Sequence, residues 1–151
     1  MARIAFDLDG VIADVDIFQL RLADFEERPK IKKELNKYYY STRKVQLRPI
    51  LLKHEDDEIY IITSRYNDLE EITRKWLKSN NIYYDKLIFV HHKPEATIDL
   101  EDWYKMQAKK KADVLKENKI DVYFEDTPST VKYLRQFCPN VKILQWGDRI
   151  V

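Results

Sequence analysis

Five short apolar runs recur along the chain, separated by longer stretches with helical spacing of apolar residues. The runs are RIAFDL at 3–8, EIYIIT at 58–63, KLIFVH at 86–91, DVYFED at 121–126 and VKILQW at 141–146. Several are continuously apolar, which is typical of parallel strands covered on both faces. Amphipathic stretches at about 66–79, 101–118 and 128–137 predict helices between them. This alternation predicts an α/β fold, a three-layer Rossmann-like parallel sheet.

One connection is longer than a crossover between parallel strands requires. Roughly 50 residues separate the first two predicted strands. They predict a helix over 15–27, a break at Pro29, a charged helix over about 30–40 and a crossover helix in LRPILLKHE at 47–55. We therefore expect one domain, 1–151, that carries a small helical cap inserted at about 14–47.

The amino-acid composition limits the classes of protein to which the chain can belong. The 151 residues carry 27 basic and 26 acidic side chains, for a formal charge of +1. This balance implies no global attraction to nucleic acid or membrane, although a local basic patch can still exist. No apolar run approaches the roughly 20 residues of a membrane span, and the first residues lack the layout of a signal peptide. The single cysteine, Cys138, cannot form an intramolecular disulfide. We expect a cytoplasmic protein with no membrane contact, and a monomer because no dimer-forming stripe stands out.

The first predicted strand ends in two carboxylates and a glycine, Asp7, Asp9 and Gly10. Two carboxylates this close repel each other unless a cation lies between them, and Mg²⁺ prefers such oxygen ligands. Glycine occurs only twice in the chain, so Gly10 marks an unusual backbone conformation or a close approach. The same scarcity excludes a glycine-rich phosphate loop.

A calcium loop of the EF-hand type would also begin with such carboxylates. It is excluded because the required glycine would fall on Ile12 and because a strand, not a helix, precedes the loop. A plain surface turn remains the competing interpretation of DLDG taken alone.

Polar residues also follow two other predicted strands. Thr63 and Ser64 end the second strand, and Glu125 and Asp126 end the fourth. A Thr-Ser pair is more often a helix cap than a phosphate ligand, and an acidic pair is usually solvated. Parallel strands, however, place their carboxyl ends at one edge, where ligands bind in open α/β sheets. A lysine-rich helix containing 109–111 precedes the fourth strand and can supply a cation.

At this point the chain resembles the haloacid-dehalogenase-like (HAD) phosphohydrolases. The matching motifs are FDLDG, YIITS, a lysine in KKKAD, and VYFEDT, in the order and on the strands that the family uses. They extend from residue 3 to about 146. A response-regulator receiver also combines acids, a threonine and a lysine, but its lysine follows the last of these strands, whereas here the lysines precede YFED.

The resemblance implies a two-step phosphoryl transfer. Asp7 would be the nucleophile and form an aspartyl phosphate, and Asp9 would act as general acid and then general base. Mg²⁺ would be held by Asp7, the backbone carbonyl of Asp9 and Asp126. Glu125, where the family more often has aspartate, would reach the metal directly or through water. Thr63 and a lysine would bind the remaining phosphoryl oxygens.

Helical spacing leaves the choice of lysine open, because Lys110 and Lys111 both lie on partly apolar stripes. In the family the catalytic lysine often stands directly before an Ala-Asp or Ala-Glu pair. The order Lys111-Ala112-Asp113 matches that pattern. We therefore expect Lys111 to be the catalytic lysine, with Lys110 in reserve for that role and as a substrate contact.

Two further resemblances favour a nucleotide or a polynucleotide end as substrate. DGVIAD, through Asp14, is similar to the first motif of 5'-deoxyribonucleotidases, and TRKWLKSNNI and DVYFEDTPSTVKYLRQF are similar to the phosphatase half of phage polynucleotide kinase/phosphatases. Asp14, Ser64 and Arg65 are the expected substrate contacts, although a strand-end arginine is more often exposed. The alternatives are a phosphatase of small sugar or metabolite phosphates, and a non-catalytic relative that binds phosphate or protein.

The remaining aromatic and histidine residues have structural interpretations. The tyrosines at 38–40 lie among cations and could stack a base, but packing of the cap is the favoured interpretation. His91 and His92 are adjacent and make a poor metal pair, so we expect edge residues. Trp76 and Trp103 occupy apolar helical positions and are expected in the core.

Overall fold

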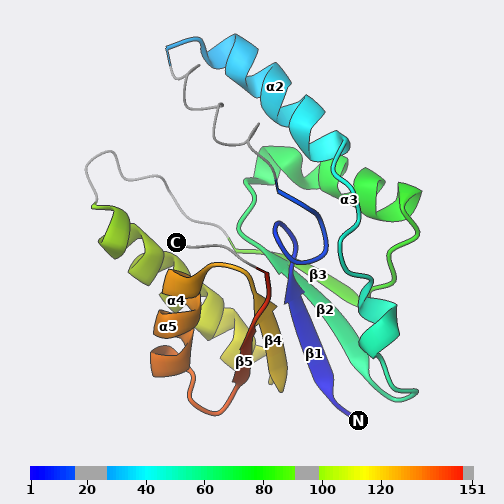
Figure 1. Cartoon of the computed structure of the whole chain (residues 1–151), viewed down its shortest axis with the longest axis vertical. Helices are drawn as coiled ribbons and strands as arrows, with labels where there is room; N and C mark the ends of the chain where they lie inside the picture. The colour runs from blue at the N-terminus through cyan, green and yellow to red at the C-terminus, as the bar shows by residue number, and fades with distance from the viewer. Residues whose placement is uncertain (16–26, 91–98, 148–151) are drawn as a thin grey trace.

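A computed structural model of the chain describes residues 1–15, 27–90 and 99–147. Its centre is a parallel sheet of five strands in the order β3-β2-β1-β4-β5 (Figure 1). The strands are β1 (Arg3–Asp7), β2 (Glu58–Thr63), β3 (Lys86–Phe89), β4 (Val122–Glu125) and β5 (Lys142–Gln145). The chain winds outward from β1 to β3 and then crosses to β4 on the other side. Such a switch point leaves a crevice at the carboxyl ends of the strands.

Helices cover both faces of the sheet, which confirms the three-layer α/β prediction. The helices α4 (Leu100–Glu117) and α5 (Pro128–Phe137) lie on one face, and α3 (Glu70–Ser79) lies on the other (Figure 1). Because side chains alternate along a strand, Ala5 packs towards α4 and α5 whereas Phe6 packs towards α3. Both side chains are fully buried, which is why the strands read as continuous apolar runs in the sequence.

The strand register aligns the ends that carry the polar motifs. Asp7 is paired with Ile62, one residue before Thr63, and Phe6 is paired with Phe124, one residue before Glu125. The ends of β1, β2 and β4 therefore lie side by side at one edge of the sheet, as predicted.

The long connection between β1 and β2 contains α2 (Pro29–Ser41), which confirms the predicted charged helix. The predicted crossover helix at 47–55 is wrong, because the structure has only a 3-10 turn there, η2 (Pro49–Leu52). The apolar residues of this run are consecutive instead of helically spaced, and Ile50, Leu51 and Leu52 are exposed. The predicted helix at 15–27 falls mostly on residues 16–26, outside the described residues.

Several expected core residues are buried. Trp76 is buried, as are Cys138 and Tyr39, whereas Tyr38 is 65% exposed and does not contribute to packing. Trp103 is only half-buried in the first turn of α4, where it packs edge-on against Tyr104.

His91 and His92 lie outside the described residues. None of the helices in the described ranges has the length and apolar character that crossing a membrane requires.

Candidate active site

Three buried carboxylates gather at the ends of β1 and β4. Asp7 is the last residue of β1, Glu125 is the last residue of β4, and Asp126 follows it. One carboxylate oxygen from each lies within 4.8 Å of the others, and all three side chains are buried. We call these residues the acidic cluster. Closely spaced carboxylate oxygens are the donor set that hard divalent cations such as Mg²⁺ prefer.

Lys111 of α4 contacts the acidic cluster. Its Nζ donates to Glu125 Oε2 at 2.8 Å and lies 3.6 Å from Asp7 Oδ1. Lys109 is exposed and Lys110 half-buried, because successive residues of a helix point about 100° apart. The tertiary structure thus brings the lysine that precedes Ala112-Asp113 to the acids.

Burial and the charge of Lys111 affect the pKa values of Asp7 and Glu125 in opposite directions. Burial and the negative charges of Glu125 and Asp126 raise the pKa of Asp7 well above its usual range, although Lys111 opposes the rise. Burial would also raise the pKa of Glu125, but the charge and hydrogen bond of Lys111 lower it. Of these two carboxylates, Asp7 is therefore the one whose ionised form is disfavoured by its surroundings.

Gly10 allows the loop after β1 to lie directly on the acidic cluster. Its φ is +88°, and a Cβ at this position would lie 1.9 Å from Asp126 Oδ2. No side chain can fit there, so the glycine is required both by conformation and by close approach. The loop is held by Leu8, whose carbonyl accepts from the amides of Ile12 and Ala13 at 3.0 and 2.9 Å.

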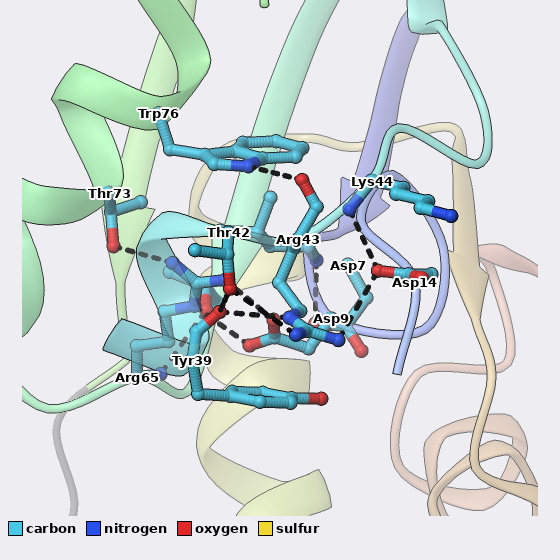
Figure 2. A network of polar contacts seen from close by, with 12 residues as sticks. Asp7, Asp9, Asp14, Tyr39, Thr42, Arg43, Lys44, Arg65, Thr73 and Trp76 are labelled. Carbon is cyan, nitrogen blue, oxygen red and sulfur yellow. Dashed lines mark hydrogen bonds and ion pairs between the residues drawn. The ribbon is translucent and has the colours of Figure 1, made fainter. Parts of the chain in front are cut away.

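Asp9 does not join the acidic cluster but pairs with Arg65 (Figure 2). Arg65 Nε donates to Asp9 Oδ2 at 2.8 Å and Nη2 donates to Oδ1 at 2.6 Å. Arg65 Nη1 donates to Thr73 Oγ1 of α3 at 2.9 Å, and the guanidinium lies over the Tyr40 ring of α2, 4.3 Å from its centroid. Arg65 is therefore buried, at 5% exposure, unlike most arginines at strand ends, and its predicted contact with the substrate stays a prediction.

Two residues with hydroxyl groups, Thr63 and Ser64, lie at the end of β2 and directly precede Arg65 in the chain. Thr63 is buried, and its Oγ1 accepts from the amide of Arg65 at 3.2 Å. Ser64 Oγ is also buried and has no hydrogen-bond partner among the described residues. A buried hydroxyl without a partner is costly, so Ser64 is suited to an external acceptor.

Asp14 joins the two ends of the β1–β2 insertion. Its Oδ1 accepts from the amide of Lys44 at 2.9 Å and lies 3.6 Å from Arg43 Nη1 (Figure 2). Arg43 also stacks on the Tyr39 ring at 3.7 Å, and its carbonyl accepts from Trp76 Nε1 at 2.8 Å. The structure thus places Asp14 at the base of α2 instead of in the acidic cluster.

Sequence reasoning missed Tyr123, which is buried and donates its hydroxyl to Glu125 Oε2 at 3.0 Å. The signal was present, since residues two apart on a strand share a face. It also missed Thr73 and Tyr40 as partners of Arg65, for which no local pattern in the sequence gave a signal.

No protein-family model matches the chain, and no curated protein matches it in sequence. Solved structures do match. A chain of the Pnkp1/Rnl/Hen1 RNA repair complex superposes with a TM-score of 0.61 at 15% identity, covering 99% of this chain and 44% of that one. A Thermotoga maritima protein assigned as a β-phosphoglucomutase gives 0.60 at 16% identity, covering 99% and 88%. A HAD-superfamily hydrolase of subfamily IA from Geobacter sulfurreducens gives 0.53 at 12% identity, covering 96% and 86%.

These likenesses define the class of the fold. Together with the strand order, they show that the chain has the HAD-like fold. The chain spans 44% and 48% of the length of two matching chains from Pnkp1/Rnl/Hen1 complexes. At these identities the likeness is one of fold, so the activity has to be argued from the acidic cluster and its surroundings.

Proposed function

We propose that the protein is a magnesium-dependent phosphomonoesterase that acts through an aspartyl phosphate on Asp7. The observation that carries the proposal is the acidic cluster, with three buried carboxylates within 4.8 Å beside the ammonium of Lys111. An enzyme that transfers a phosphoryl group needs such an arrangement, because nucleophile and substrate are both negatively charged. The HAD-like fold supports the same reaction class.

The residues of the acidic cluster fit Mg²⁺ as a cofactor. Asp7 and Asp126 are its expected side-chain ligands, together with the backbone carbonyl of Asp9. Glu125 already accepts from Lys111 and Tyr123, which favours a contact with the metal through water or a role in placing Lys111. When bound, Mg²⁺ would offset the negative charge of the carboxylates that hold it and polarise a phosphoryl oxygen.

In the proposed reaction, an Asp7 oxygen attacks phosphorus and the bond to the ester oxygen breaks. The leaving oxygen takes a proton from Asp9, and a water then attacks the aspartyl phosphate and returns a proton to Asp9. Inorganic phosphate and free Asp7 result. Thr63, Ser64 and Lys111 would hold the phosphoryl oxygens, with Lys110 as a further contact.

Arg65 would position Asp9 for this proton transfer. Both Asp9 oxygens accept from Arg65, so one contact has to open before Asp9 can carry a transferable proton. The released N–H groups of Arg65 would then be placed to bind the substrate. Asp14 would act less directly, by fixing the base of the α2 segment, which we propose as a small cap at about 14–47 of a single-domain protein.

A nucleotide or a polynucleotide end is the proposed substrate class. The likeness to a chain of an RNA repair complex supports it. A phosphatase of small sugar phosphates is the second candidate, because of the likeness to the protein assigned as a β-phosphoglucomutase. We further propose a monomer that acts in the cytoplasm.

Turnover of p-nitrophenyl phosphate tests the reaction class. We expect Mg²⁺-dependent hydrolysis that falls by at least about 10³-fold in Asp7→Asn, since an amide cannot act as the nucleophile. Thermal unfolding of the variant serves as the control for folding. Equal hydrolysis by the variant and the parent would refute the proposed nucleophile, and a folded parent without any turnover would indicate a binding protein. A screen of nucleoside monophosphates, phosphorylated oligonucleotides and sugar phosphates then separates the two substrate classes.

A further inference from the structure

A groove of about 260 Å³ lies between α2 and the segment that follows β2. Lys32, Lys33, Asn36 and Lys37 of α2 form one wall, and Tyr66 and Asp68 contribute to the other. We call it the lysine groove. The acidic cluster and the Asp9–Arg65 pair are not part of its lining, so it is a second surface and not an extension of the candidate active site.

Positive charge is concentrated around this groove. Residues 27–44 contain seven basic and two acidic side chains, although the whole chain carries a formal charge of only +1. Lys37 lies 3.9 Å from Glu34, but both side chains are substantially exposed, at 42% and 77%. Exposed pairs of this kind are weak and screened by salt, so Lys37 can exchange Glu34 for another anion.

The lysine groove leads towards the candidate active site along one stripe of α2. Lys33, Lys37 and Tyr40 are spaced by four and three residues, so they lie on one face of the helix. Tyr40 stacks on Arg65, which holds Asp9. At 1.5 Å per residue, Lys37 and Lys33 lie about 5 and 10 Å from Tyr40 along the helix axis.

An aromatic ring lines the same groove. Tyr66 directly follows Arg65 and is 49% exposed. Single-stranded nucleic acids bind to surfaces that combine a track of cations with aromatic rings on which bases stack. A nucleoside monophosphate or a sugar monophosphate bound at Asp7 has no second phosphate that could reach Lys33, about 10 Å from Tyr40 along the helix axis.

We propose that the lysine groove binds the backbone of a single-stranded polynucleotide whose terminal phosphate occupies the site of Asp7, Asp9 and Arg65. Lys33 and Lys37 contact internal phosphates, and Tyr66 stacks on a base near the end. This inference rests on the proposed phosphatase function and deepens it, because it makes a polynucleotide end the substrate in preference to a free nucleotide.

The experiment compares two double variants of equal charge change. Lys33→Glu with Lys37→Glu alters the lysine groove. Lys116→Glu with Lys142→Glu is the control, because Lys116 forms an equivalent exposed pair with Asp113 at 3.8 Å and Lys142 is exposed at the start of β5, at the opposite edge of the sheet. Each pair is also made in an Asp7→Asn background for binding measurements.

Fluorescence anisotropy with a terminally phosphorylated single-stranded oligonucleotide measures binding in the Asp7→Asn background. We expect the groove variant to bind at least ten-fold more weakly than the control. The slope of log affinity against log salt should fall by about 0.7 for each phosphate contact that is lost. In active protein, kcat/KM for the oligonucleotide should fall at least ten-fold relative to that for p-nitrophenyl phosphate, mainly through KM.

Three results would overturn the inference. The first is an equal loss of oligonucleotide binding in the groove variant and the control, which would indicate long-range electrostatics alone. The second is oligonucleotide binding by the groove variant at parental strength. The third is a parent protein that hydrolyses nucleoside monophosphates or sugar phosphates as efficiently as oligonucleotides. Failure of the proposed phosphatase function is seen separately, as absence of p-nitrophenyl phosphate turnover, while the binding measurement still reports on the groove.

Discussion

Two buried groups of charges meet at the end of β1, and they differ in how their charge is balanced. In the acidic cluster, Asp7 belongs to a set of three carboxylates, and Lys111 contacts two of them, Asp7 and Glu125. Two residues later, Asp9 forms a bidentate pair with Arg65, one carboxylate with one guanidinium. Among the described residues, the first group combines three carboxylates with one ammonium, and a divalent cation can bind to such a group. In the second group the two charges balance each other. Arg65 also contacts Thr73 of α3 and Tyr40 of α2, and these contacts join both helices to the end of the sheet.

Loss of the lysine should have the largest effect on stability. Lys111→Met leaves the buried carboxylates of Asp7 and Glu125 without their ammonium, and we expect a loss of about 3–5 kcal/mol in the free energy of unfolding. Mg²⁺ should recover part of this loss, because it can replace the missing positive charge. Denaturant unfolding with and without Mg²⁺ measures both effects. A variant as stable as the parent without Mg²⁺ would contradict the description of the acidic cluster.

Loss of the arginine should cost less, and Mg²⁺ should stabilise the Arg65→Met variant only as much as it stabilises the parent, because the acidic cluster is intact in both. Arg65→Met leaves only Asp9 without its partner, and the Asp9 side chain is 19% exposed, so water compensates in part. We expect a loss of about 2–3 kcal/mol. Activity should fall as well, and Arg65→Lys should restore less than full activity because an ammonium cannot make the bidentate contact. A larger gain in stability from Mg²⁺ in Arg65→Met than in the parent would erase the distinction between the two groups.

The pH dependence of stability should separate the groups further. Folding raises the pKa of Asp7, so the folded protein holds this proton more tightly than the unfolded chain. Stability of the metal-free protein should therefore fall as pH rises through the raised pKa. Mg²⁺ binds the ionised carboxylate, so its stabilising effect should grow over the same range.

Thermal unfolding across pH, with and without Mg²⁺, measures this dependence. The pKa of Glu125 is lowered, so below its ordinary value of 4.5 this residue makes stability rise with pH, opposite to the effect of Asp7. The effect of Asp7 is therefore measured above pH 4.5. Asp7→Asn should abolish the slope. A metal-free parent whose stability does not fall with rising pH would show that Asp7 is not strained by its neighbours.

The smallest effect is expected for the hydroxyl of Tyr123. Tyr123→Phe removes one hydrogen bond to Glu125, while Lys111 still donates to the same carboxylate. We expect a loss of about 1 kcal/mol and a decrease in kcat of a few-fold. Tyr84→Phe removes the hydroxyl of a half-buried tyrosine just before the start of β3, at the amino ends of the strands, and provides a control for loss of a phenolic hydroxyl away from the acidic cluster. A decrease in kcat as large as that of Lys111→Met would give Tyr123 a direct part in the reaction.

Much of the fold could be predicted from local patterns. The strands at 3–8 and 58–63 were recognisable because both faces of these strands are buried, so their apolar residues are continuous. The prediction failed at 47–55, where consecutive apolar residues form only a 3-10 turn. The apolar composition of this run indicated burial, but Leu51 is 74% exposed. No local rule distinguishes an apolar run that other elements cover from one that stays exposed to solvent.

By itself, the amino-acid sequence determined which chemical groups reach the edge of the sheet, because strand ends and their polar residues follow from short-range periodicity. Only the tertiary structure decided which of these groups meet. It joined Asp9 to Arg65 across 56 positions and selected Lys111 from three adjacent lysines. It also placed Gly10 against Asp126. The physical reason is that a buried charge is stabilised by whichever partner the order of the strands and the rotation of the helices bring within about 3 Å, and that proximity is absent from any local stretch of the chain.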